Sequence, residues 1–163
     1  MARIYVSVGS NVEPRQNIRR AVADLRAHYG ELLLSSVYES RAVGFDGDNF
    51  LNLVVGFDTD EDAHTVVGVL RGIEARCGRE RNAARFAPRS LDLDLLLYDR
   101  QVLQENGLQL PRGEITEHAF VLCPLAEIAP NLAHPVEGVR FSELWEGFDM
   151  PGQSLWPVEF NFE

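Results

Sequence analysis

Residues 85–98 read RFAPRSLDLDLLLY, an arginine-rich loop that runs into an apolar strand. Successive side chains of a strand alternate between its two faces, so Asp92 and Asp94 share one face while leucines occupy the other. The leucines suit a sheet with one face buried in a core. The two carboxylates must then lie together on the opposite face.

Two carboxylates in this arrangement lie roughly 7 Å apart along the strand, repel each other and need a cation. Hard oxygen ligands suit Mg²⁺, which binds through one or two carboxylates, water and the oxygens of a phosphate. Arg89, just before the strand, offers a bidentate guanidinium to a phosphate. The alternative is that Asp92 and Asp94 are solvated strand residues whose charge Arg89 balances.

The length of 163 residues fits a single domain, residues 1–163, with a core of its own. A hydrophobic content of 45% and a charged content of 25% are typical of a soluble globular protein, and no apolar run approaches the ~18 residues of a membrane span. The first nine residues are too short and too alternating for a signal peptide. We therefore expect a cytoplasmic protein without a membrane partner.

The formal net charge of −10 argues against nucleic acid as a partner, because binding to a duplex requires a basic surface. All fifteen basic residues are arginine, which excludes a lysine nucleophile, a lysine base and a P-loop lysine. A basic island within an acidic chain indicates a small, highly charged anion as ligand. This arginine island consists of Arg71, Arg76, Arg79, Arg81, Arg85 and Arg89.

The periodicity of apolar residues predicts an alternation of strands and helices. Strands are expected at residues 4–8, 32–38, 50–57 and up to 98, and helices at 14–29 and 58–77. A hairpin into residues 102–103, short helices at 123–130 and 141–145, and an aromatic tail docked on the core are expected to follow. This order predicts an α+β fold with a ferredoxin-like βαββαβ core, an antiparallel or mixed sheet with helices packed on one side, and additional short C-terminal helices.

Two polar segments, residues 39–49 and 79–88, lack periodicity and are predicted to be mobile surface loops. Both lie next to strand ends in the predicted order. We expect them to close over a site at the edge of the sheet.

The stretch APRSLDLDL at residues 87–95 resembles the G/A-P-R-x-x-D-L-D signature of the 6-hydroxymethyl-7,8-dihydropterin pyrophosphokinase family of folate biosynthesis. Other pieces resemble the family in order and approximate spacing, and together they cover the chain from about residue 5 to 130. These pieces are VGSN at 8–11, FLN at 50–52, Glu74 with Gly78-Arg79, and FVLCPLAEIAP at 120–130.

The resemblance implies transfer of pyrophosphate from ATP to the hydroxymethyl oxygen of the dihydropterin, with release of AMP. It implies two Mg²⁺ ions held by Asp92 and Asp94, and a monomer whose partners are ATP and the pterin. Catalytic roles would fall to Arg79 and Arg89 with the two aspartates. The nucleotide would be bound by Glu74, Arg79, Arg81, Arg89, Arg112 and His118, and the pterin by Phe50, Asn52, Phe86 and Phe120.

Two positions depart from the family pattern. Arg112 stands where a histidine is expected near the nucleotide, and Phe86 where an aromatic residue, often tryptophan, closes a loop over the substrates. Other interpretations also remain open: Glu74 could be a helix-surface acid paired with Arg71 or Arg81, and Phe50 and Phe120 could be core residues.

Two other functions remain as alternatives: a pterin- or nucleotide-binding relative that has lost transfer activity, and a metal-dependent phosphohydrolase. The second lacks an evident base, because none of the four histidines adjoins the D-x-D motif. Each histidine is interpreted as a surface or helix residue rather than a metal ligand. These are His28, His64, His118 and His134.

Overall fold

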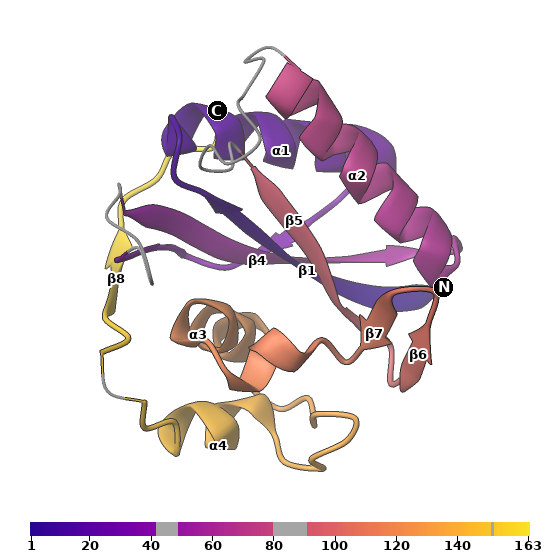
Figure 1. Ribbon diagram of the computed structural model, residues 1–163, viewed down its shortest axis with the longest axis vertical. Coiled ribbons are helices and arrows are strands. Elements are labelled where there is room, and N and C mark those ends of the chain that lie inside the picture. Colours follow the sequence, from indigo (N-terminus) through magenta and orange to yellow (C-terminus); the bar gives the residue numbers. More distant parts are fainter. Residues whose placement is uncertain (42–48, 80–90, 151) are drawn as a thin grey trace.

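The computed structural model describes residues 1–41, 49–79, 91–150 and 152–163, with helices on both faces of a central sheet (Figure 1). The main sheet and its first helices are β1 (Ala2–Ser10), α1 (Pro14–Tyr29), β2 (Leu33–Leu34), β3 (Val37–Ser40), β4 (Phe50–Thr59), α2 (Ala63–Arg79) and β5 (Asp92–Tyr98). There follow β6 (Leu103–Glu105), β7 (Leu108–Leu110), a 3-10 turn (Gly113–Thr116), α3 (Ala119–Ile128), α4 (Phe141–Glu146) and β8 (Leu155–Val158).

The main sheet has the order β5-β1-β4-β3-β8, and β2 lies beside β3 along the same edge of β4. All of its neighbouring pairs in the described ranges are antiparallel. The order of β5, β1, β4 and β3, with α1 and α2 as connections, is that of a ferredoxin-like βαββαβ unit. The fold class predicted from the sequence is confirmed.

The two faces of the sheet pack against different helices (Figure 1). Alternate residues of β1, among them Ile4, Val6 and Val8, join the core beneath α1 and α2. Tyr5 points the other way, into a second core with α3 and α4. The predicted position of helices on one side therefore holds for α1 and α2, while the C-terminal helices cover the opposite face.

A bulge in β5 allows this strand to contribute to both cores. Val6 of β1 pairs with Leu95 and Tyr5 pairs with Leu97, which leaves Leu96 as an extra residue. Leu95 packs in the first core, whereas Leu96 and Leu97 both pack in the second. Three consecutive leucines are thereby buried.

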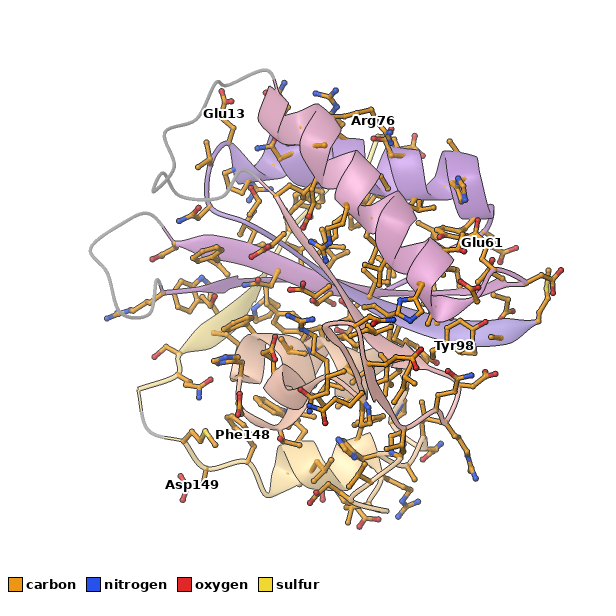
Figure 2. All side chains as sticks on the ribbon, turned by 45° about the vertical axis from the view of Figure 1, so that its right-hand side comes forward. Glu13, Glu61, Arg76, Tyr98, Phe148 and Asp149 are labelled. Carbon is orange, nitrogen blue, oxygen red and sulfur yellow. The ribbon has the colours of Figure 1, made fainter. Side chains whose placement is uncertain are left out.

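A polar cluster closes the sheet at the end where α2 begins. The Glu61 carboxylate lies 2.7 Å from His28 Nε2 and accepts a hydrogen bond of 2.7 Å from the Tyr29 hydroxyl. The Tyr98 hydroxyl donates to the Glu61 carbonyl at 2.5 Å, and the two residues lie close together in Figure 2. Since Tyr98 is the last residue of β5, the aspartates at its start lie at the opposite end of the sheet.

The single buried strand predicted for residues 32–38 is wrong, because the chain forms two short strands there. Between them Ser35 bonds to Val54 of β4: its N–H donates to the Val54 carbonyl and its hydroxyl accepts from the Val54 N–H. Leu33 is 43% exposed. The apolar run indicated a buried strand. The segment instead lies along one edge of β4, and neither residue of β2 is fully buried.

The predicted loops begin later than expected. Strand β3 continues to Ser40, and α2 extends through Arg79. Residues 42–48 and 80–90 lie outside the described part of the chain, so the mobility and closure of these segments remain predictions.

The predicted start of the second helix and the predicted hairpin both need correction. Strand β4 runs to Thr59, and α2 begins after Asp62, whose carboxylate accepts from the Thr65 N–H at 2.8 Å. Residues 58–62 read DTDED, so the sequence did not show which of these acids caps the helix. The hairpin is formed by β6 with β7, around a turn in which Asn106 and Gly107 have positive φ angles.

The C-terminal third also differs from the prediction. Helix α3 begins at Ala119 rather than Cys123, and Pro124 lies inside it. Phe160 and Phe162 dock on the core as expected, but Trp156 lies in β8 and is 37% exposed.

His134 needs a further correction, because it is buried in a loop rather than placed on the surface or in a helix. Its Nδ1 accepts from the N–H groups of Val136 and Glu137, and burial lowers its pKa.

Among the described helices, none is long and apolar enough to cross a membrane.

Glu127 of α3 forms hydrogen bonds to Ser36 and to β3 of the main sheet. Its carboxylate accepts from the Ser36 N–H at 3.1 Å, from the Ser36 hydroxyl at 2.8 Å and from the Tyr38 hydroxyl at 2.8 Å. Burial, together with this hydrogen bond, raises the pKa of Tyr38, so the phenol remains a donor. One acid thus ties α3 to β3.

We expect Glu127→Ala to lower the free energy of unfolding by about 1 to 2 kcal/mol, because several charge-assisted hydrogen bonds at an accessible site are lost together. Urea unfolding followed by circular dichroism measures the change. Glu146→Ala, at an exposed position of α4, is the control and should stay within about 0.5 kcal/mol. Equal stability of the Glu127→Ala variant and the parent would contradict this anchoring role.

Candidate active site

One end of the second sheet face is polar and is not filled by α3. Tyr5, Val54 and Leu97 lie on this face beneath α3 and are buried. Toward the other end, the same alternation of β1, β4 and β5 brings small and polar residues to the face. These residues are Ser7, Gly9, Asn52, Asp92 and Asp94.

These residues form the floor of a cavity of about 360 Å³. Its walls come from the start of β4, the end of β3, the 3-10 turn and the start of α3. The lining residues are Ser7, Val8, Gly9, Ser40, Arg41, Phe50, Asn52, Asp92, Asp94, Leu96, Arg112, Glu114, His118, Phe120 and Val121. Seven of the residues that the sequence selected meet here: Phe50, Asn52, Asp92, Asp94, Arg112, His118 and Phe120.

The two aspartates lie next to each other on the cavity floor. Asp92 is paired with Gly9 of β1, and Asp94 with Ser7. Asp94 Oδ1 lies 3.6 Å from a guanidinium nitrogen of Arg71 and 3.6 Å from one of Arg112. Two cations therefore compensate the charge of this half-buried carboxylate.

The donor set fits a hard divalent cation that arrives with phosphate. Magnesium commonly takes one or two carboxylates from a protein and completes its shell with water and phosphate oxygens. The described ranges contain no group of three or more His, Cys, Asp and Glu side chains that could enclose a metal by itself. Asp92 and Asp94 leave most of a coordination shell to other ligands.

Asn52 has a fixed orientation on the floor. It is 6% exposed, and its Nδ2 donates to the Ser40 hydroxyl at 3.0 Å. Gly9 lies opposite it in β1, and a Cβ at position 9 would come within 2.7 Å of Asn52 Oδ1. Glycine is therefore required at position 9 to make room for the amide.

Aromatic rings and one histidine form part of the cavity wall. Phe50 and Phe120 both line the cavity, and Phe120 also packs against the second core. The His118 ring stacks on Phe120, with centroids 4.8 Å apart and an interplanar angle of 16°. Phe120 therefore packs against the second core and also lines the cavity.

Arg112 reaches the cavity from the segment after β7. Its backbone N–H donates to the carbonyl of the bulged Leu96 at 3.0 Å, which fixes the chain beside β5. Its Nε donates to Glu114 at 2.5 Å, and another guanidinium nitrogen faces Asp94. The arginine that replaces the expected histidine is thus a cation at the carboxylate site.

Glu74 does not line the cavity. Its carboxylate accepts from the Leu93 N–H at 2.7 Å and pairs with Arg71, whose guanidinium also donates to the Leu93 carbonyl at 2.8 Å. Burial raises the pKa of Glu74, and the Leu93 N–H and the Arg71 charge oppose that shift. The pairing with Arg71 left open by the sequence is present, and it holds the free edge of β5.

Some assigned residues cannot be placed. The side chain of Arg79 and the whole of Arg81, Phe86 and Arg89 lie outside the described residues. Their roles remain predictions.

Ser40 was not predicted from the sequence, because its contact with Asn52 depends on strand register. Arg71 was predicted as a member of the arginine island and as a possible partner of Glu74, but its contact with Asp94 depends on α2 crossing the edge of β5.

A family model described as 7,8-dihydro-6-hydroxymethylpterin-pyrophosphokinase (HPPK) matches residues 5–130. Three similar proteins carry the name 2-amino-4-hydroxy-6-hydroxymethyldihydropteridine pyrophosphokinase. The one from Pseudomonas aeruginosa is 38% identical over 92% of this chain and 98% of its own. That from Bacillus subtilis is 35% identical over 89% and 93%, and that from Aquifex aeolicus 34% over 83% and 86%.

Solved structures show the same fold. A crystal structure of an HPPK-DHPS in complex with substrates has a TM-score of 0.72 at 12% identity, and covers 90% of this chain and 43% of its own. Wild-type HPPK-DHPS from Plasmodium falciparum has a TM-score of 0.67 at 12% identity, covering 89% and 44%. This chain thus spans less than half of each solved chain.

We expect Gly9→Ala to lower the free energy of unfolding by about 1 to 3 kcal/mol, because the new methyl group must displace the buried Asn52 amide. Gly68→Ala is the matched control, because nothing lies within 4 Å of a Cβ at this position in α2. We expect it to raise the free energy of unfolding by about 0.5 to 1 kcal/mol. Urea unfolding measures both variants. A Gly9→Ala protein as stable as the parent would show that Asn52 does not need this space.

Proposed function

This chain belongs to the 7,8-dihydro-6-hydroxymethylpterin-pyrophosphokinase family, and from that membership we propose how its cavity performs the family's reaction. The protein is an ATP-dependent diphosphotransferase of folate biosynthesis. It transfers pyrophosphate from ATP to 6-hydroxymethyl-7,8-dihydropterin, giving the pterin diphosphate and AMP.

The observation that supports this assignment is that the cavity has two chemically different ends, one on each side of β1. Phe50 and Asn52 lie on β4 at one end, and with Phe120 they offer flat apolar surfaces and one amide. Asp94 lies on β5 at the other end, and with Arg112 it offers charges of both signs. A pterin is a flat ring with an amide-like edge, and a triphosphate is a polyanion that binds with a cation, so each end suits one substrate.

At the pterin end, the two phenylalanine rings flank the substrate and Asn52 hydrogen-bonds its edge. One amide hydrogen of Asn52 is already used by Ser40, which fixes the side chain before the substrate arrives. The carbonyl oxygen and the second hydrogen remain for a ligand edge that has both a donor and an acceptor. Phe86 would complete the aromatic enclosure, as its position in the sequence predicts.

At the phosphate end, Asp92 and Asp94 would hold Mg²⁺, and we expect two ions. Arg112 lies next to Asp94 and can reach a phosphate oxygen of a nucleotide bound there. Arg79 and Arg89 are assigned to the triphosphate, with Arg81 and His118 as further nucleotide contacts. Glu74 was also expected there, but its carboxylate lies outside the cavity lining and is bound to the Leu93 N–H and Arg71, so we assign it to the support of β5 instead.

The protein contributes mainly position and charge to the transfer. A cation held by Asp92 and Asp94 would supply neutralisation of the negative charge that spreads over the phosphate oxygens in the transition state. Fixed walls on the pterin hold its hydroxymethyl oxygen at one end of the phosphate site, so the two substrates meet in one orientation. Arg112, which lies beside Asp94, would add fixed positive charge at the phosphates.

The reaction can be tested directly by following AMP release from ATP and Mg²⁺, with and without hydroxymethyldihydropterin. We expect release that depends on the pterin. ATP breakdown at the same rate without pterin would favour a phosphohydrolase, and tight binding of both ligands without AMP release would favour an inactive relative.

We expect Asp92→Asn or Asp94→Asn to reduce turnover below detection, because each removes a charged ligand of the metal while preserving the shape of the side chain. The AMP assay at saturating substrate measures the loss. Asp149→Asn changes an exposed aspartate in the same way and should keep the parent rate. Turnover within about tenfold of the parent in either cavity variant would rule out the metal assignment.

We expect Arg112→Ala to weaken binding of ATP with Mg²⁺ by about 1.5 to 3 kcal/mol, the size of a hydrogen bond between charged groups, and to leave pterin binding without nucleotide nearly unchanged. Calorimetric titration with a non-hydrolysable ATP analogue measures the loss. Arg100→Ala, at an exposed turn, should change it by at most about 0.5 kcal/mol. If Arg112→Ala behaves like Arg100→Ala, Arg112 has no phosphate contact.

A further inference from the structure

The C-terminal segment, residues 152–163, lies beyond the family match that ends at residue 130. In Figure 1 the yellow chain leaves α4, passes beside α3 to β8 and ends next to α1. Figure 2 shows Phe148 and Asp149, where the chain leaves α4 on the far side of α3 from the sheet. This segment therefore borders elements that build the cavity wall.

One contact of the segment reaches the Asn52 side of the cavity. Strand β8 pairs with β3, and Leu155 is opposite Ser40, the last residue of β3. The Ser40 hydroxyl accepts the hydrogen bond from Asn52. Pairing with β8 therefore holds the backbone of the residue that orients Asn52.

A second contact reaches the Phe120 side. Gln153 Oε1 accepts from the Ala119 N–H at 2.7 Å, and Gln153 Nε2 donates to the Glu117 carbonyl at 2.9 Å. Ala119 is the first residue of α3, and His118 at the N-cap forms no side-chain cap hydrogen bond. Gln153 therefore caps α3 from a distant part of the chain. It accepts from the Ala119 N–H, which has no acceptor within the helix because it lies in the first turn.

The two contacts lie side by side. Ser40, Phe120 and Gln153 all border one small cleft next to the cavity, and Leu155 is two residues beyond Gln153. Phe120 lies in the first turn of α3, the turn that the Gln153 hydrogen bonds fix. The segment thus connects the two walls between which the pterin is assigned.

The far end of the segment is also fastened. Arg15 of α1 donates to the Glu159 carbonyl at 3.0 Å, and Arg19 donates to the Asn161 carbonyl at 2.6 Å. Both guanidinium groups lie over the Phe160 ring, at 5.6 and 5.4 Å from its centroid. The segment that carries Gln153 is therefore attached to the main sheet through β8 and to α1 through its last residues.

We propose that Gln153 is a positioning residue for the pterin site: it caps α3 from the C-terminal segment and so holds Phe120 in the wall that the pterin contacts. This inference rests on the proposed function, which assigns Phe120 to the pterin. Gln153 itself does not line the main cavity and touches no reacting group. Its loss should therefore affect the affinity for one substrate more than the other.

The test compares Gln153→Leu, which has a similar size and no hydrogen-bonding groups, with Gln153→Glu. Titration calorimetry gives the Kd of 6-hydroxymethylpterin in the presence of a non-hydrolysable ATP analogue and Mg²⁺, and separately the Kd of the analogue. Gln16→Leu, the same change at an exposed position of α1, is the control. Thermal unfolding of each variant shows that it is folded at the temperature of the titration.

For Gln153→Leu we expect the pterin Kd to rise about threefold to tenfold and the Kd of the ATP analogue to change less than about twofold. Gln153→Glu should give a smaller loss, since a carboxylate still accepts from the Ala119 N–H but cannot donate to the Glu117 carbonyl. Gln16→Leu should match the parent for both ligands. This ligand-specific pattern with partial rescue is not expected of a residue that only stabilises the fold.

Two results would overturn the inference: a pterin Kd within about twofold of the parent in Gln153→Leu, or an equal loss of affinity for both ligands. Where Gln153→Leu is unfolded at the titration temperature, Gln153→Glu decides: an unchanged pterin Kd, or an equal loss of affinity for both ligands, would overturn the inference. A parent protein that binds no pterin would overturn the proposed function instead, so the two failures are distinguishable.

Discussion

The pairing of β1 with β4 on one side and β5 on the other is the constraint on which the rest of the structure depends. Its register places Gly9 opposite both Asn52 and Asp92, so one row across three strands unites residues from distant parts of the chain. The alternation of a strand then directs the apolar residues to the opposite face. Core and cavity are two consequences of the same pairing.

The charges of the cavity follow a second constraint. The protein carries a net charge of −10, yet Asp94 lies between the guanidinium groups of Arg71 and Arg112. A guanidinium that compensates a carboxylate can also donate hydrogen bonds to phosphate oxygens. The two arginines therefore balance the charge of Asp94 in the free protein and also suit the phosphate site that we propose.

Hydrogen bonds from side chains to distant backbone groups hold the walls around this floor. Glu74 supports the free edge of β5, Glu127 joins α3 to Ser36, and Gln153 caps the start of α3. Each of them accepts from a backbone N–H for which the described residues supply no strand or helix partner. Parts of the cavity that belong to different elements are thereby kept in one arrangement.

The sequence by itself determined the fold class and the shared face of the paired aspartates, because strand and helix periods and the D-x-D spacing are local patterns. Its resemblance to a family selected five further residues of the cavity lining. Only the tertiary structure decided that residues 32–38 divide into two edge strands, that Gly9 makes room for Asn52, and that Arg71 reaches Asp94. Those features depend on strand register and on which element covers an edge. Neither is encoded in a short stretch of residues, because both arise from contacts between segments far apart in the chain.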